Sequence, residues 1–182
     1  TLSFKDYGAR TMARLMQYFL ASRGERRVIL VATSGDTGCA VADGFAGQDN
    51  IEVVLLYPKG KVSTVQERQL IVERPGVRSF AVEGDFDDCQ RVVKEAFVDS
   101  SLAHLPLSSA NSINIGRLLP QSLYYLWAVN QSGLKNPNFC VPSGNLGNLT
   151  GGIFAALVGQ PVHHFVAAHN AKQATSVVLH SV

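Results

Sequence analysis

An apolar run followed by a polar turn, residues 27–38, determines the fold class; it reads Arg-Val-Ile-Leu-Val-Ala-Thr-Ser-Gly-Asp-Thr-Gly. The run from Arg27 to Thr33 is rich in β-branched residues and too short for a helix, which is typical of a strand. Residues 34–38 are the small and polar types that end a strand and open a helix. Because the strand is apolar throughout, we expect it to lie in a parallel sheet covered by helices on both faces.

The same strand, turn and helix pattern recurs on either side of this stretch. An amphipathic helix is predicted before it, over 6–20, from the helical spacing of apolar residues. The elements expected after it are a helix over 41–46, a strand over 51–57, a turn over 58–61, a helix over 63–72, a strand over 77–82 and a helix over 85–98. This alternation predicts an α/β fold of open, twisted, mostly parallel sheets with helices on both faces.

A second, shorter series of elements follows an irregular stretch at 107–111. A helix is expected over 115–130, with a kink where Pro120 lacks a backbone N–H. The connector 132–138 is rich in Gly, Pro and Asn. Beyond it we expect a strand over 139–142, a turn over 143–148, a helix to about 158 and a strand over 162–168. The connector is therefore the predicted boundary between two lobes, 1–131 and 132–182, the second of them incomplete.

Composition narrows the class of function. The 182 residues are 46% hydrophobic, and 16 Lys plus Arg against 14 Asp plus Glu give a net charge of +2. So balanced a charge argues against a nucleic acid or a membrane surface as partner and favours a small molecule. No apolar run is long enough to span a bilayer. The sequence starts at Thr1 without a secretory signal, from which we expect a processed or partial chain.

Cysteine and histidine do not suggest a metal or disulfide framework. Cys39, Cys89 and Cys140 are odd in number and widely spaced, so we expect buried, reduced thiols and a cytoplasmic protein. The five histidines show no persuasive metal-ligand spacing.

Two turns that follow predicted strands are candidate binding sites, because open parallel sheets bind ligands beyond the carboxyl ends of their strands. The turn 143–148, Ser-Gly-Asn-Leu-Gly-Asn, has the composition that lets backbone N–H groups converge on an anion at a helix N-terminus. It matches no nucleotide-binding pattern, and a helix-capping turn without a ligand is the alternative. The turn 33–38 offers hydroxyls and glycines that suit a carboxylate; the alternative is that Ser34 or Asp36 only caps the next helix.

Lys5 is the candidate nucleophile. An amine attacks a carbonyl when desolvation lowers its pKa, and Leu2 and Phe4 favour this if they pack around it. The alternative is an ordinary solvated lysine near a helix start. Together, a reactive lysine, a phosphate-sized turn and a carboxylate-sized turn are the parts that an enzyme using pyridoxal 5′-phosphate on an amino acid requires.

Six sequence blocks carry a resemblance to a known family. They are Thr-Leu-Ser-Phe-Lys-Asp at 1–6, Ala-Thr-Ser-Gly-Asp-Thr-Gly at 32–38, Leu-Tyr-Pro-Lys-Gly-Lys-Val-Ser at 56–63, Val-Glu-Gly-Asp-Phe-Asp-Asp-Cys-Gln at 82–90, Ser-Ala-Asn-Ser-Ile-Asn at 109–114 and Val-Pro-Ser-Gly-Asn-Leu-Gly-Asn at 141–148. In this order they resemble the bacterial-type threonine synthase family, a branch of the fold-type II pyridoxal-phosphate enzymes. The resemblance runs to about residue 170, and we expect the tail 171–182 to fall outside it.

The resemblance implies a role for each matching position. Lys5 corresponds to the lysine that binds the cofactor covalently. The residues corresponding to the cofactor-phosphate turn are Ser143, Gly144, Asn145, Leu146, Gly147 and Asn148, of which Leu146 and Asn148 replace the Phe and Asp of many relatives. The residues corresponding to the loop for the substrate α-carboxylate are Thr33, Ser34, Gly35, Asp36 and Thr37.

Substrate phosphate contacts are assigned to Ser112, Asn114 and Arg117, with Lys59 and Lys61 as alternatives. A guanidinium fork suits phosphate, although a solvated helix arginine at position 117 is the competing interpretation. The implied reaction converts O-phospho-L-homoserine and water to L-threonine and phosphate, with Lys5 as the main proton carrier. We expect an incomplete chain, because the family's members are longer. A related β-eliminating enzyme, such as a serine or threonine dehydratase, and a non-catalytic fragment that binds phosphate-bearing ligands remain as alternatives.

Overall fold

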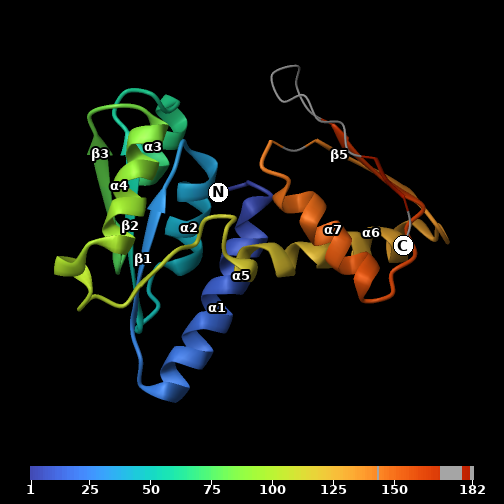
Figure 1. Ribbon diagram of the computed structural model, residues 1–182, viewed down its shortest axis with the longest axis horizontal. Helices are drawn as coiled ribbons and strands as arrows, with labels where there is room; N and C mark the ends of the chain where they lie inside the picture. Colours follow the sequence, from blue (N-terminus) through green and yellow to red (C-terminus); the bar gives the residue numbers. More distant parts are fainter. Residues whose placement is uncertain (143, 169–177, 181–182) are drawn as a thin grey trace. The chain divides into compact units, whose positions relative to one another are not determined.

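The computed structural model describes residues 1–142, 144–168 and 178–180. The chain forms two compact units, Thr1–Asn114 and Ile115–Val182 (Figure 1). Each unit is built around a sheet of its own.

The first unit contains a parallel four-stranded sheet in the order β3-β2-β1-β4. Its strands are β1 (Arg27–Ala32), β2 (Ile51–Pro58), β3 (Val77–Val82) and β4 (Leu107–Ser108). The strand β4 falls where the sequence predicts irregular structure. It forms because β1 has an open edge there: Val28 N–H donates to the Pro106 carbonyl at 3.0 Å, and Val28 pairs with Leu107.

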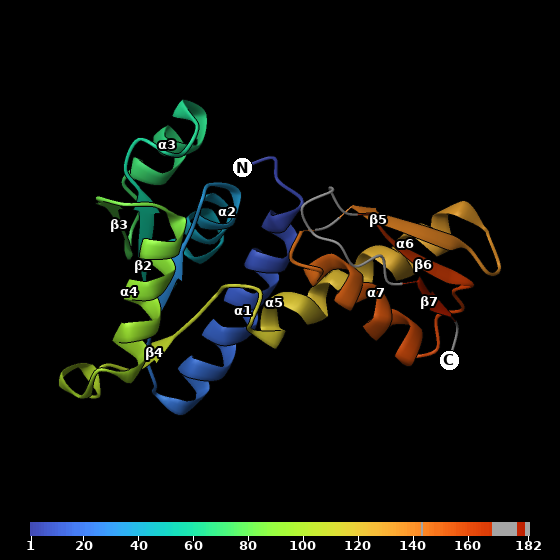
Figure 2. The ribbon, with the colours of Figure 1, turned by 45° about the horizontal axis from the view of Figure 1, so that its top comes forward.

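Helices cover both faces of this sheet, as the apolar strands predict. They are α1 (Lys5–Arg23), α2 (Asp36–Phe45), α3 (Thr64–Ile71) and α4 (Phe86–Val98), with a 3₁₀ turn at Ser100–Leu102. One apolar cluster joins Val31 and Leu55 to residues of α1, α2 and α3, such as Phe45. A second joins Leu30 to Val93 of α4, on the opposite face (Figure 2). The α/β prediction is therefore confirmed for this unit.

The second unit combines a broken helical segment with a three-stranded sheet. The elements are α5 (Ile115–Leu118), a 3₁₀ turn (Leu119–Gln121), α6 (Ser122–Ser132), β5 (Asn138–Pro142), α7 (Gly147–Leu157), β6 (His164–Ala168) and β7 (Val178–His180). The sheet order is β5-β6-β7, with β5 parallel and β7 antiparallel to β6. The helix predicted over 115–130 is interrupted by the 3₁₀ turn at Pro120, which lacks the N–H that an α-helix would use there.

The boundary between the units lies earlier than the sequence predicts, between Asn114 and Ile115 rather than between 131 and 132. The reason is the packing of α6. The ring of Tyr125 lies 4.8 Å from that of Phe139 and 5.8 Å from that of Phe165, centroid to centroid, in one apolar cluster with β5 and β6. The connector 132–138 is thus a loop inside the second unit.

Candidate functional site

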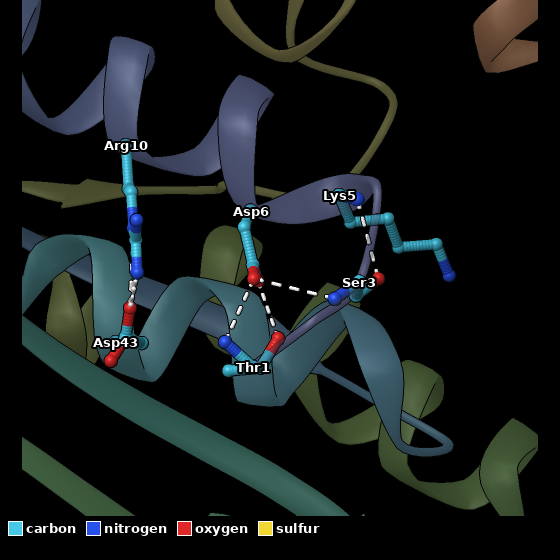
Figure 3. A network of polar contacts seen from close by, with 6 residues as sticks. All are labelled: Thr1, Ser3, Lys5, Asp6, Arg10 and Asp43. Carbon is cyan, nitrogen blue, oxygen red and sulfur yellow. Dashed lines mark hydrogen bonds and ion pairs between the residues drawn. The ribbon is translucent and has the colours of Figure 1, made fainter.

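Lys5 is the first residue of α1, and its side chain extends away from the polar cluster around Asp6 (Figure 3). Its backbone N–H donates to the Ser3 hydroxyl at 3.2 Å. Asp6 accepts hydrogen bonds from the Thr1 hydroxyl and, at 3.3 Å, from the Ser3 N–H. These contacts fix the backbone on which Lys5 stands.

The apolar neighbours of Lys5 do not form the expected enclosure. The side chain of Leu2 is fully exposed and that of Phe4 is 57% exposed. Lys5 itself is half-buried. Because both side chains are exposed, any desolvation of the Lys5 amine has to come from other groups.

Thr33 determines the shape of the turn after β1. Its buried hydroxyl accepts hydrogen bonds from the N–H groups of Gly35, at 3.0 Å, and Gly38, at 2.8 Å, and donates to the Gly35 carbonyl at 3.1 Å. These bonds use the donor and both lone pairs of the hydroxyl. Gly35 has φ 142° and ψ −99°, a conformation that L residues with a Cβ avoid. Thr33 therefore holds the turn from inside, and its hydroxyl is not available for a ligand.

The polar groups that the turn presents outward are those of Ser34, Asp36 and Thr37. Ser34 and Asp36 are exposed, and Thr37 is half-buried. The alternative that Ser34 or Asp36 caps the next helix is wrong. The N-cap of α2 is Gly35, and the Gly38 N–H donates its hydrogen bond to the Thr33 hydroxyl. The N–H groups of the first helical turn have no intrahelical acceptor and face the same side as the helix dipole's positive end. A carboxylate fits this turn.

The segment after β4 lies at the same sheet edge as the turn after β1, since these parallel strands are neighbours. The Asn111 side-chain amide donates to the Ala32 carbonyl at 3.0 Å, and that of Asn114 donates to the Ser109 carbonyl at 2.8 Å. Ser112 and Asn114 are half-buried. Asn111 was not among the predicted site residues. Its position after a strand was a usable signal, but the strand β4 was not predicted.

Lys59 and Lys61 follow β2 at this edge and are exposed. Lys59 forms an ion pair with Glu83, which follows β3. The hydrogen bond from Lys59 to Glu83 raises the pKa of the lysine. Three neighbouring strands thus bring the turn 33–38, the segment 109–114 and the two lysines to one edge of the first unit's sheet.

The turn 144–148 opens helix α7 in the second unit; Ser143, predicted as part of it, lies outside the described residues. Leu146, the N-cap, has φ 57° and ψ 6°, in the left-handed region. The Asn145 side chain accepts from the Gly147 N–H at 3.1 Å. Gly144 and Asn145 are exposed. The start of an 11-residue helix is thus preceded by an open turn of small residues, which suits an anion.

The Asn148 side chain faces the protein interior. It accepts a hydrogen bond from the Tyr125 hydroxyl at 2.8 Å and donates to Gln121 Oε1 at 3.3 Å. Burial raises the pKa of Tyr125 to about 12, so this hydroxyl remains a donor at neutral pH. The side-chain role of Asn148, which its departure from the family pattern put in question, is therefore contact with the helical segment 115–132.

Arg117 is a buried cation. Arg117 is only 5% exposed, and burial lowers the pKa of its guanidinium to about 10. The competing interpretation of a solvated helix arginine is wrong. A charge held in so dry an environment is an apt binding group for phosphate.

The thiols are partly as expected. Cys39 and Cys89 are buried, and burial raises the pKa of both, whereas Cys140 is exposed on β5. Within the described ranges, no three residues of His, Cys, Asp or Glu are grouped so as to bind a metal ion. In the same part of the chain, no helix has both the length and the apolar character to cross a membrane.

A family model described as "Pyridoxal-phosphate dependent enzyme" matches residues 1–181 of the chain. The match includes most of the tail 171–182, which we expected to lie outside the family resemblance.

Individual relatives point in the same direction. The chain is 51% identical over 176 residues to a threonine synthase of Haemophilus influenzae, covering 94% of this chain and 41% of that protein. The crystal structure of the Escherichia coli threonine synthase matches with a TM-score of 0.82 and 45% identity, over 96% of this chain and 41% of that one. A pyridoxal-phosphate-bound threonine synthase from Brucella melitensis matches with a TM-score of 0.84 and 41% identity, over 92% and 37%. The chain thus spans about two fifths of the length of these relatives.

Proposed function

The chain belongs to the pyridoxal-phosphate-dependent enzymes, and from this premise we propose that its protein is a threonine synthase, which converts O-phospho-L-homoserine and water to L-threonine and phosphate. The observation that carries the proposal is the 51% identity to a protein of that name over nearly the whole chain.

The residues present fit pyridoxal 5′-phosphate. The open turn before α7, with Leu146 in a left-handed conformation, leaves backbone N–H groups for a phosphate. The residues proposed to hold the cofactor are Lys5, through its amine, and Ser143, Gly144, Asn145, Leu146, Gly147 and Asn148, through the turn. When bound, the cofactor supplies an electron sink for carbanion density on the substrate.

The substrate's two anionic ends match two kinds of group in the chain. We assign the α-carboxylate to the turn 33–38, where the Ser34 and Thr37 hydroxyls and the first N–H groups of α2 are the donors. Thr33 and Gly35 shape the turn. Asp36, at the start of α2, accepts from the Gln66 side chain at 2.7 Å. The phosphate is assigned to Ser112, Asn114 and Arg117. Arg117 is buried, and its guanidinium is a planar fork of donors that suits a phosphate.

Lys5 is proposed to carry protons. Its amine would accept a proton from the substrate carbon that bears the amino group and would return protons at later steps. The donors around the phosphate stabilise negative charge as that group departs. A reducing cytoplasm is part of the proposal, supported by three free cysteines.

The experiment that tests the function combines labelling with turnover. Borohydride reduction of the cofactor-saturated protein is expected to attach a pyridoxyl group to Lys5, detected by peptide mass spectrometry, and Lys5→Ala is expected to abolish the label. Phosphate release and threonine formation from O-phospho-L-homoserine are expected for the wild type. Turnover of serine or threonine without phosphate release supports the related β-eliminating enzyme instead. An unlabelled protein without turnover supports the non-catalytic alternative.

A further inference from the structure

Three buried side chains of the second unit are spaced four residues apart along the segment 115–132. They are Arg117, Gln121 and Tyr125, which are 5%, 9% and 3% exposed. The spacing places them on one side of the segment even though Pro120 interrupts the helix. Gln121 and Tyr125 both contact Asn148, at the start of α7.

A continuous chain of hydrogen bonds runs through these residues. The Tyr125 hydroxyl donates to Asn148 Oδ1 at 2.8 Å, and Asn148 Nδ2 donates to Gln121 Oε1 at 3.3 Å. Gln121 Nε2 then donates to the Arg117 carbonyl at 2.8 Å. The backbone that bears the buried guanidinium is thereby connected to the turn proposed for the cofactor phosphate.

Helix α7 packs closely against the segment that bears these residues. A Cβ at Gly151 would lie 2.7 Å from Gln121 Cβ, and one at Gly152 would lie 2.6 Å from Phe165 and 2.7 Å from Tyr125. Only glycine allows α7 to approach the segment so closely. Any change in the hydrogen bonds of Gln121 must therefore shift α7 or Arg117 rather than be absorbed by loose packing.

The amide of Gln121 is chemically suited to this place. Its oxygen accepts from Asn148 while its nitrogen donates to the Arg117 carbonyl, so its two ends have opposite roles. A carboxylate has no donor for the carbonyl, whereas a protonated carboxyl group has one.

We propose that Gln121 is a positioning residue that holds Arg117 at a fixed distance from the turn 144–148 and so sets the affinity for the phosphate-bearing substrate. This rests on the proposed function. Gln121 acts through Arg117 and Asn148 and does not itself touch the substrate.

The test compares Gln121→Glu and Gln121→Met with the wild type, and uses Gln131→Glu, an exposed site at the other end of α6, as the matched control. Losing one such hydrogen bond is expected to raise KM for O-phospho-L-homoserine about fivefold to tenfold. We expect kcat to stay within about twofold, since Lys5 and its surroundings are unchanged. The dissociation constant for pyridoxal 5′-phosphate, measured by fluorescence titration of the apoprotein, is expected to rise with KM.

The pH dependence of KM distinguishes a positioning role of Gln121 from a general loss of structure in the variants. The KM of Gln121→Glu, divided by that of the wild type at the same pH, should fall as acid protonates the buried carboxyl group and restores a donor. The same ratio for Gln121→Met should not change with pH. Equal, pH-independent effects of both variants, or a loss of kcat with KM unchanged, would overturn the inference.

Failure of the proposed function is recognised separately. If the wild type does not turn over O-phospho-L-homoserine, the function is wrong, and the positioning role is then decided by the cofactor titration alone. A cofactor affinity that is the same in Gln121→Met and the wild type contradicts the role whatever the substrate is.

Discussion

The buried environment of Arg117 changes the pKa of its guanidinium. Folding lowers the pKa of this base, so the folded protein binds its proton less tightly than the unfolded chain does. Below about pH 10 the guanidinium is charged in the folded and the unfolded state, and the lowered pKa opposes folding there. Arg117 also lies on the segment that the resemblance links to phosphate, and a guanidinium fork suits that group.

Replacing this charge by an apolar side chain should remove the effect of phosphate on stability. Arg117→Met has no guanidinium to donate to the anion, so added phosphate should no longer raise the unfolding midpoint. Denaturant unfolding with and without phosphate measures the effect, and Arg14→Met, at an exposed site on α1, is the control. A phosphate effect that is the same in Arg117→Met and the wild type would contradict the assignment of the phosphate to Arg117.

At the scale of elements, the start of α7 carries backbone strain. Leu146, at φ 57°, occupies a region that L residues other than Asn, Asp and Gly seldom enter. The Leu146 carbonyl accepts two hydrogen bonds, from the Thr150 N–H and from the Thr150 hydroxyl, both at 2.9 Å. Backbone strain of this kind persists in proteins mainly at turns that bind ligands, which supports the proposed role of this turn.

Substitutions at Leu146 should therefore depend on backbone conformation more than on burial. Leu146→Val is expected to destabilise the protein by about 1 to 2 kcal/mol, because a β-branched residue is disfavoured in this region. Leu146→Gly, which removes more apolar surface, should cost less. Thermal unfolding of the two variants tests this order, and a larger loss for the glycine variant would mean that the side chain's contacts outweigh the strain.

The whole molecule consists of two units with separate apolar clusters. The first is organised around a parallel sheet whose central strands are buried on both faces. The second depends on aromatic contacts of Tyr125, Phe139 and Phe165. Separate cores predict that damage to one unit need not spread to the other.

A cavity in the core of the first unit should destabilise that unit and leave the second unit unchanged. Leu55 is fully buried at the centre of β2, so Leu55→Ala is expected to cost about 2 to 5 kcal/mol. Hydrogen exchange should show lost protection in β1, β2 and α2, with the amides of α6 and α7 unchanged. Leu149→Ala on α7 is the reciprocal variant. Equal loss in both units would show that they unfold as one.

The layered α/β architecture follows from the order of residues alone, because apolar runs and polar turns alternate strongly enough to mark most strands and helices. The order of residues also pointed to the turn 33–38, the turn before α7 and Lys5, since local chemistry places such residues at strand ends and helix starts. It could not determine what each side chain faces. The edge strand β4 and the earlier unit boundary arise from hydrogen bonds and ring contacts between distant residues.

The contacts of individual candidate site residues became known from the folded structure. Thr33 has its hydroxyl engaged within its own turn, Asn148 faces the interior, and Arg117 is buried. Each outcome depends on which groups lie nearby after folding, and therefore on burial and hydrogen-bond geometry that residue order does not express. The physical reason is that the pattern along the chain specifies local conformation and polarity, whereas the charge state and orientation of a side chain depend on its neighbours in space.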